Sequence, residues 1–188
     1  MNAGAFGADI ASVLVGVSLL LRDGSINDFP AQSLELGYRT SALKEGRLAA
    51  TILDARIALA VSNPDDCRRA VEAIGIQRLE RFPQGASSGC IFRNPPKGPT
   101  AGELLDLAGC KSMHQGKARV SRIHANFIVN DGQDNARDIL ALIERMAQRV
   151  LQVHGQHLEL EVILPCAGDS PQGWGLSPSQ ASRSRKSK

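Results

Sequence analysis

This sequence has no long apolar run, and its longest one, Ala11–Leu21, ends at Arg22 and Asp23. A membrane-spanning helix needs roughly 20 apolar residues, so we expect no membrane span and read this run as a buried strand. A hydrophobic content of 43% with a mean hydropathy of −0.14 is typical of a globular protein. This composition excludes a chain that is disordered or collagenous as a whole.

The main body of the chain also lacks an excess of charge. The 22 basic and 19 acidic residues give a net charge of +3. The segment from Ala167 onward holds one acidic and four basic residues, which leaves 18 of each sign before it. A domain that binds nucleic acid usually carries its basic excess on the docking surface, so we expect no nucleic-acid partner. Residues 167–188 are predicted to be a disordered basic tail.

The sequence contains no CxxC pair, no Gly-x-Gly-x-x-Gly motif and no Walker motif, and we expect no signal peptide. Four cysteines without a tight framework suggest reduced thiols, and we therefore expect a cytoplasmic protein. His154, His157 and Cys166 are weak metal-ligand candidates because no second ligand pair has zinc spacing. We expect no metal site.

The first part of the chain is predicted to be rich in β structure. Ser12–Leu21 reads as a strand followed by an Asp-Gly turn, and Pro30–Leu36 as a helical turn. Residues Thr51–Leu59 alternate between apolar and polar side chains, which favours a half-buried strand. Residues 1–61 thus look like part of a sheet.

The second part alternates helices and strands. Asn63 and Pro64 predict a helix start, with a helix running to Arg81, and Thr100 and Glu103 have the spacing of a capping box. A loop separates these two helices. Further on, the pattern predicts a brief strand at 126–130, a helix at 135–154 and a strand at 158–164. Residues 62–166 therefore read as a compact α/β domain, with the boundary near Val61–Asn63.

Three kinds of residue are candidates for chemistry. Cys90 follows a glycine in a loop, where it is either a proton-donating thiol or simply a small buried residue. Arg39 also lies in a loop and suits either a substrate carboxylate or a surface position. Glu159 and Glu161 share one face of a predicted strand, which is either solvated or partly buried. His124 precedes a buried strand and is structural or close to a substrate.

Several segments, taken in order, resemble the UDP-N-acetylenolpyruvoylglucosamine reductase family, whose members are also called UDP-N-acetylmuramate dehydrogenases. The matching segments cover nearly all of residues 1–162: Met1-Asn-Ala-Gly-Ala-Phe-Gly7, Gly37-Tyr-Arg-Thr-Ser41, Ser88-Gly-Cys-Ile-Phe-Arg-Asn-Pro95, Ala101-Gly-Glu-Leu-Leu-Asp-Leu-Ala-Gly109, Val120-Ser-Arg-Ile-His-Ala-Asn-Phe-Ile-Val-Asn130 and Leu158-Glu-Leu-Glu-Val162. The joint match is highly specific, above all at His124–Asn130.

The resemblance implies an α+β fold in two parts. Residues 1–61 correspond to the C-terminal part of a flavin-binding domain, and residues 62–166 to a substrate-binding domain. The family's Asn-Ala-Gly motif lies well inside its flavin domain, whereas this chain begins there. The resemblance therefore predicts that the N-terminal part of the FAD-binding domain is lacking, or that a separate chain supplies it.

The resemblance also implies a reaction and its residues. Members use FAD and NADPH to reduce UDP-N-acetylglucosamine enolpyruvate to UDP-N-acetylmuramate in peptidoglycan synthesis. The implied catalytic residues are Arg39 at the substrate carboxylate, Glu161 assisting it and Cys90 donating a proton. The implied contacts are those to the cofactor by Asn2, Ala3 and Gly4, and those to the substrate by Tyr38, Arg93 and Asn94.

Two departures from the family pattern bear on these roles. Serine is common in relatives at the position of Cys90, and a thiol, with an ordinary pKa of about 8.5, is compatible with proton donation. The stretch Gly116–Arg119 carries cations where small and amide residues are usual. The alternative to an enzyme is a non-catalytic remnant, or a module that binds a UDP-sugar without holding FAD.

Overall fold

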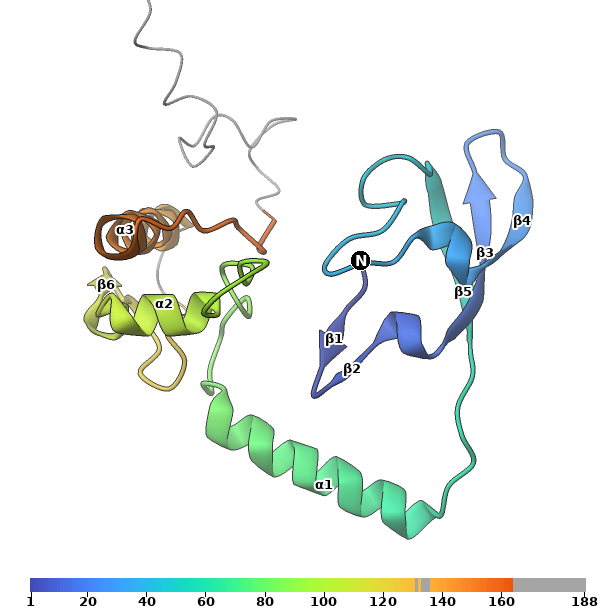
Figure 1. Ribbon diagram of the computed structural model, residues 1–188, viewed down its shortest axis with the longest axis horizontal. Helices are drawn as coiled ribbons and strands as arrows, with labels where there is room; N and C mark the ends of the chain where they lie inside the picture. Colours follow the sequence, from blue (N-terminus) through green and yellow to red (C-terminus); the bar gives the residue numbers. More distant parts are fainter. Residues whose placement is uncertain (131, 133–135, 164–188) are drawn as a thin grey trace, which may run out of the picture. The chain divides into compact units, whose positions relative to one another are not determined.

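The computed structural model describes residues 1–130, 132 and 136–163, and it has the expected α+β fold (Figure 1). The chain divides into two compact units, Met1–Ile74 and a second unit that begins at Gly75. Each unit has its own hydrophobic core. The domain boundary drawn from the sequence near residue 61 stays a prediction, as does the basic tail, which lies outside the described residues.

The first unit is built on a three-stranded antiparallel sheet in the order β4-β3-β5. Its strands are β3 (Leu14–Leu21), β4 (Ile26–Pro30) and β5 (Ala50–Ile57). The predicted Asp-Gly turn joins β3 to β4, and the main-chain N–H and hydroxyl of Ser25 both donate to the Asp23 carboxylate at 3.0 and 2.7 Å. A short 3₁₀ helix, Ala31–Leu34, follows β4 and brings Leu34 onto the sheet beside the buried Val17 and Leu19.

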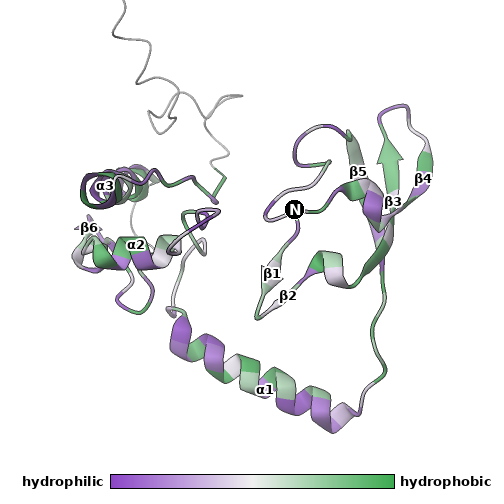
Figure 2. Ribbon diagram, in the orientation of Figure 1, coloured by the Kyte–Doolittle hydropathy of each residue, from purple (hydrophilic) through white to green (hydrophobic). Residues whose placement is uncertain are grey.

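The prediction of a half-buried strand at Thr51–Leu59 is wrong in its burial, although β5 does form. The apolar residues of β5 are exposed on both faces, at 49% for Ile52, 49% for Leu53 and 54% for Ile57. Alternation along a strand reports which side chains share a face, but not whether another element covers that face. Figure 2 shows hydrophobic colour on β5 as well as on β3, the central strand, so hydropathy alone does not separate the exposed strand from the buried one.

A helix α1 (Pro64–Arg81) begins and ends where the sequence predicts. Asn63 accepts a hydrogen bond from the Asp65 main-chain N–H at 2.8 Å, which confirms the predicted cap. Asp65 pairs with Arg68, and Asp66 with Arg69, one turn further along the helix. None of the residues of α1 is buried, and Figure 2 shows hydrophilic and hydrophobic residues mixed along it.

The second unit packs two helices against short antiparallel strands. The helices are α2 (Ala101–Leu107) and α3 (Ala136–His154), and the strands are β6 (His114–Gln115), β7 (Ala118–Val120) and β8 (Ile128–Val129). The strands pair in the order β6-β7-β8. One face of α3 buries four side chains in the core, those of Leu142, Ile143, Met146 and Val150.

Three local expectations change in this unit. The strand predicted at 126–130 is limited to β8, and the strand predicted at 158–164 is a single bridge between Phe92 and Leu160 within the described residues. The sequence pattern does not predict β6 and β7, because two and three residues are too few to reveal a period of two. No helix among the described residues combines the length and low charge that crossing a bilayer requires.

Replacing Thr100 by alanine should destabilise the second unit. The Thr100 hydroxyl accepts a hydrogen bond from the Glu103 main-chain N–H at 3.3 Å, and the Glu103 carboxylate accepts one from the Thr100 N–H at 2.7 Å. Losing such a cap costs about 1 kcal/mol, measured as the free energy of unfolding in urea by circular dichroism. The control Lys97→Ala, an exposed change just before the cap, should leave that free energy unchanged. An equal loss in both variants would show that the capping box does not stabilise α2.

Candidate active site

The loop that carries Cys90 is anchored on both sides by main-chain pairing. Cys90 forms an antiparallel bridge with Phe127, and Phe92 forms one with Leu160. The side chains of Ile91 and Phe92 are each 1% exposed, whereas Cys90 itself is only partly buried. The pairing therefore buries the two residues after the thiol and leaves the thiol near the surface of the unit.

Asn126 is the residue that holds this segment in place. Its side-chain oxygen accepts a hydrogen bond from the Phe92 N–H at 2.9 Å, and its side-chain amide donates to the Phe92 carbonyl at 2.8 Å. Its own carbonyl accepts a bond from the Ile91 N–H at 2.9 Å. Asn126 is 1% exposed, so these bonds form away from water, where an unmade bond is costly.

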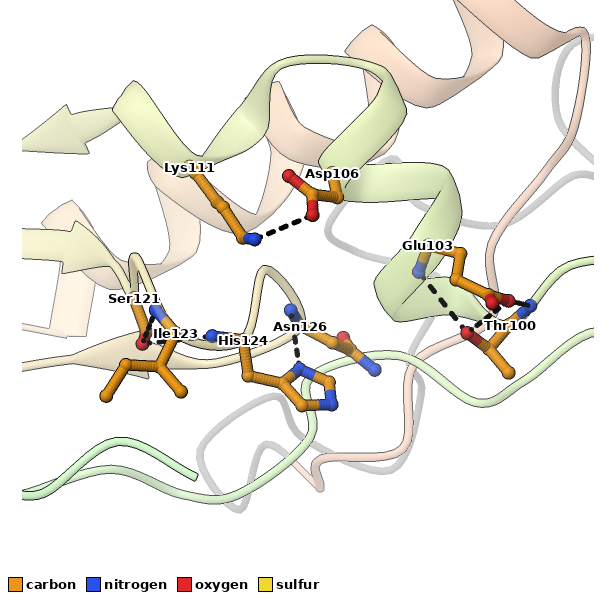
Figure 3. A network of polar contacts seen from close by, with 8 residues as sticks. All are labelled: Thr100, Glu103, Asp106, Lys111, Ser121, Ile123, His124 and Asn126. Atoms are coloured by element: carbon orange, nitrogen blue, oxygen red, sulfur yellow. Dashed lines mark hydrogen bonds and ion pairs between the residues drawn. The ribbon is translucent and has the colours of Figure 1, made fainter. Parts of the chain in front are cut away.

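His124 in turn positions Asn126. The His124 Nδ1 accepts a hydrogen bond from the Asn126 main-chain N–H at 3.2 Å (Figure 3), so its ring is in the form with the proton on Nε2. The ring stacks on Phe82 at 5.8 Å between centroids and meets the edge of Phe127 at 4.9 Å. Burial, and to a lesser degree the charge of Lys111, lowers the pKa of His124 below its ordinary 6.5.

Removing the Asn126 side chain should cost about 2–6 kcal/mol of unfolding free energy. Asn126→Ala leaves the buried N–H and carbonyl of Phe92 without partners, and each unsatisfied group costs about 1–3 kcal/mol. Asn130→Ala is the matched control, since its side chain makes one exposed bond to Gly132. Urea unfolding of both variants measures the difference. A loss at Asn126 no larger than that at Asn130 would contradict the anchoring role.

The titration of His124, followed by NMR, should have a midpoint below 6.5. Because the folded pKa is lower than the unfolded one, the unfolded state binds more protons as pH falls through 6.5, so the fold loses stability there. Lys111→Gln should raise the midpoint, yet keep it below 6.5, because burial is the larger cause. A midpoint at or above 6.5 in the parent would refute this description of the ring.

Arg93 and Asn94 follow the buried pair and have different surroundings. The Arg93 N–H donates to the Glu159 carbonyl at 2.8 Å, and its guanidinium Nη1 lies 3.8 Å from the Glu159 carboxylate. The Arg93 Nε is buried and has no hydrogen-bond partner within the part of the chain that the structure describes. Asn94 is exposed, and its side-chain oxygen accepts a bond from the Ala101 N–H at 3.1 Å, at the start of α2.

Glu161 and Glu159 differ in exposure, although both lie beside the Cys90 loop. The Glu161 N–H donates to the Ile91 carbonyl at 2.8 Å, and the Glu161 side chain is partly buried. The Glu159 side chain is 77% exposed. The sequence left open whether this face is solvated or partly buried: Glu159 is solvated and Glu161 is partly buried. The structure brings Cys90, Arg93 and Glu161 onto neighbouring chain segments of one unit.

In the first unit, Asn2, Ala3 and Gly4 belong to a small hairpin. Its strands are β1 (Gly4–Ala5) and β2 (Ala8–Asp9), joined by Phe6 and Gly7, which both have positive φ. The Asn2 side chain is 5% exposed, donates to Asp9 at 2.8 Å and accepts from the Ala11 N–H at 2.9 Å. Its polar atoms are therefore used within the hairpin, and only main-chain groups remain for a ligand.

Tyr38 and Arg39 form the tip of a tight turn in the same unit. Gly37 and Thr40 exchange two main-chain hydrogen bonds of 3.3 Å, and Arg39 adopts a left-handed φ of 56°. The Arg39 guanidinium lies 5.3 Å from the centre of the Tyr38 ring, and Tyr38 is 58% exposed. A bridge between Asn2 and Tyr38 places the turn beside the residues expected to bind the cofactor.

No group of metal-ligating side chains forms a site within residues 1–130, 132 and 136–163. His154 and His157 are exposed, and Cys166, their proposed companion, lies outside the described residues. Sequence reasoning missed Asn126 as a functional residue, because a buried asparagine before a strand has no distinctive spacing. Cys110, which is fully buried with a pKa raised to about 11 by that burial, is an inert thiol.

Comparisons with known proteins agree with this arrangement. Residues 79–164 match a family model described as UDP-N-acetylenolpyruvoylglucosamine reductase, C-terminal domain. UDP-N-acetylenolpyruvoylglucosamine reductases of Chloroflexus aggregans and Granulibacter bethesdensis are 40% and 41% identical over 86% of this chain, which covers 55% and 51% of theirs. The crystal structure of the reductase from Thermus caldophilus aligns with a TM-score of 0.73 and 34% identity, over 87% of this chain and 57% of that one.

The second unit, with its anchored loop, thus matches the C-terminal domain model of the UDP-N-acetylenolpyruvoylglucosamine reductase family over residues 79–164. The chain belongs to the UDP-N-acetylenolpyruvoylglucosamine reductase family. It spans about half the length of the curated relatives it matches.

Proposed function

We propose that this chain carries out the substrate-binding and proton-donating part of UDP-N-acetylenolpyruvoylglucosamine reduction. The reaction converts UDP-N-acetylglucosamine enolpyruvate to UDP-N-acetylmuramate, in peptidoglycan synthesis, with FAD and NADPH. The observation that carries the proposal is the anchored segment around Cys90. Cys90 pairs with Phe127, and the next residue, Ile91, accepts a hydrogen bond from the Glu161 N–H through its carbonyl. Support comes from relatives of that name at 40% identity. We propose a cytoplasmic location, where sugar nucleotides are made.

The residues expected to hold FAD could bind it through their main-chain N–H and carbonyl groups. The Asn2 side chain is committed to Asp9 and Ala11, so Asn2, Ala3 and Gly4 offer peptide groups and little side-chain bulk. A Cβ on Gly4 would lie 3.1 Å from the Ala8 carbonyl oxygen, a close approach that a larger residue could keep only if the neighbouring strand shifted by a few tenths of an ångström. When bound, FAD would accept electrons from NADPH and supply a hydride to the alkene carbon remote from the substrate carboxylate.

The roles of the chain's own residues follow from the charge that this step creates. Negative charge develops on the carboxylate side, where the guanidinium of Arg39, assisted by Glu161, stabilises it. The Cys90 thiol then gives its proton to the carbon next to the carboxylate, and the resulting thiolate recovers a proton from solvent. Tyr38, Arg93 and Asn94 bind the sugar nucleotide, and the unpartnered Arg93 Nε is a donor suited to its oxygen atoms.

A second candidate function rests on the match of residues 79–164 to the C-terminal domain model. In this interpretation the chain is a non-catalytic module that binds a UDP-sugar without FAD. The comparisons give no support to a separate chain that supplies the flavin half. Absorbance of the purified chain near 450 nm separates the two candidates: bound flavin supports the enzyme. A colourless chain that still binds the UDP-sugar supports the module.

Cys90→Ala should abolish formation of UDP-N-acetylmuramate in flavin-loaded protein, while oxidation of NADPH by the flavin continues. Cys90→Ser should retain turnover, because a hydroxyl also donates a proton. Loss of a general acid lowers kcat by about 10²–10⁴-fold. Cys67→Ala, an exposed cysteine on α1, is the control and should match the parent. Equal turnover in Cys90→Ala and the parent would remove Cys90 from the proposed mechanism.

A further inference from the structure

The ring of His124 is enclosed by the start of α2 and by two phenylalanines. It stacks on Phe82 at 5.8 Å between ring centroids and meets the edge of Phe127 at 4.9 Å. Gly102 lies so close that a Cβ at that position would come within 2.9 Å of the His124 Cε1, a separation that real side chains do not adopt. The imidazole cannot retreat from α2 without losing its packing on the phenylalanines. These contacts therefore fix the plane of the ring.

One hydrogen bond fixes which edge of the ring faces the main chain. The His124 Nδ1 accepts a bond from the Asn126 N–H at 3.2 Å (Figure 3). If the ring were turned over about its Cβ–Cγ bond, a carbon atom would stand at this place and the N–H of a residue that is 1% exposed would lose its acceptor. The bond spans two residues, as in the turns that asparagine and aspartate side chains form with the main chain. Its acceptor thus holds residues 124–126 in a turn.

This turn leads directly to the segment that carries the Cys90 thiol. The Phe127 N–H donates to the His124 carbonyl at 3.1 Å, and Phe127 forms the main-chain bridge with Cys90. The Asn126 carbonyl accepts a bond from the N–H of Ile91, the residue after the thiol, at 2.9 Å. His124 therefore contacts both residues that pair with the Cys90 segment, and an effect of its ring on the thiol passes through them.

We propose that His124 is a positioning residue for the Cys90 thiol, because its Nδ1 acceptor holds the turn that places Cys90 for proton transfer. The catalytic consequence rests on the proposed function, whereas the placement of the thiol does not. In this account the packing of the ring stabilises the unit and the hydrogen bond places the thiol. Substitution separates the two contributions, because phenylalanine keeps an aromatic ring and asparagine keeps an acceptor.

The rate at which iodoacetamide alkylates each cysteine of the full chain, resolved by peptide mass spectrometry, tests this placement without flavin or substrate. In His124→Phe, Cys90 should react about fivefold faster than in the parent, since the loss of one hydrogen bond loosens its segment by about this factor. Cys67, exposed on α1, should keep its parent rate, and the buried Cys110 should stay the slowest of the three. In His124→Asn, whose side-chain oxygen can accept the Asn126 N–H, the Cys90 rate should stay within about twofold of the parent.

Three outcomes would overturn the proposal. An unchanged Cys90 rate in His124→Phe would show that the hydrogen bond does not place the thiol. A parallel rise in the rates of Cys90 and Cys110 would show that the unit unfolds as a whole, which leaves His124 a structural role alone. A rise in His124→Asn as large as that in His124→Phe would assign the effect to the lost ring.

The catalytic consequence is measured in flavin-loaded protein. His124→Phe should lower kcat for the enolpyruvyl substrate about fivefold, with KM within about twofold of the parent and NADPH oxidation unchanged. A higher KM with an unchanged kcat would contradict a role in placing the proton donor. If Cys90→Ala proves fully active, the proposed function fails, whereas the alkylation rates still decide whether His124 places the thiol.

Discussion

The buried amide of Asn126 is the constraint on which the second unit depends. Two hydrogen bonds of this one side chain satisfy the N–H and the carbonyl of Phe92, and Asn126 and Phe92 are each only 1% exposed. This pairing fixes the segment between Cys90 and Arg93, and Glu161 and Asn94 are then placed by their own bonds to the Ile91 carbonyl and the Ala101 N–H. An apolar residue at position 126 would leave these peptide groups without partners.

The aromatic packing around His124 supports the segment that carries Cys90. His124, which stacks on Phe82 and meets the edge of Phe127, supports Asn126 by accepting a hydrogen bond from its main-chain N–H. Its lowered pKa keeps the ring neutral near pH 7, so that Nδ1 remains an acceptor for the Asn126 N–H. Lys111, which is paired with the Asp106 carboxylate at 2.6 Å, contributes to that shift.

Much of the fold is predictable from local signals. The ends of α1 and the cap of α2 follow from Asn63 and Thr100, whose side chains accept bonds from main-chain groups two and three residues later. Strands β6 and β7 are not predicted, because two and three residues are too few to reveal a period of two, although the two strands pair as a tight hairpin. The exposure of β5 could not be predicted either, because alternation of apolar and polar residues does not show whether another element covers the strand. For the candidate site, the resemblance singles out Cys90, Arg39 and Glu161, but not Asn126, whose role exists only through its partner at position 92.

Amide hydrogen exchange of the parent protein tests this account most directly. If Asn126 and its neighbours anchor the Cys90 segment, the amides of Ile91, Phe92, Arg93 and Glu161 should exchange as slowly as that of Val120 in the core strand β7. The amides of Ile91 and Phe92, which both donate to Asn126, should also share one opening free energy. Exchange of Phe92 at the rate of the exposed residues Gly85–Ser88 would contradict the account.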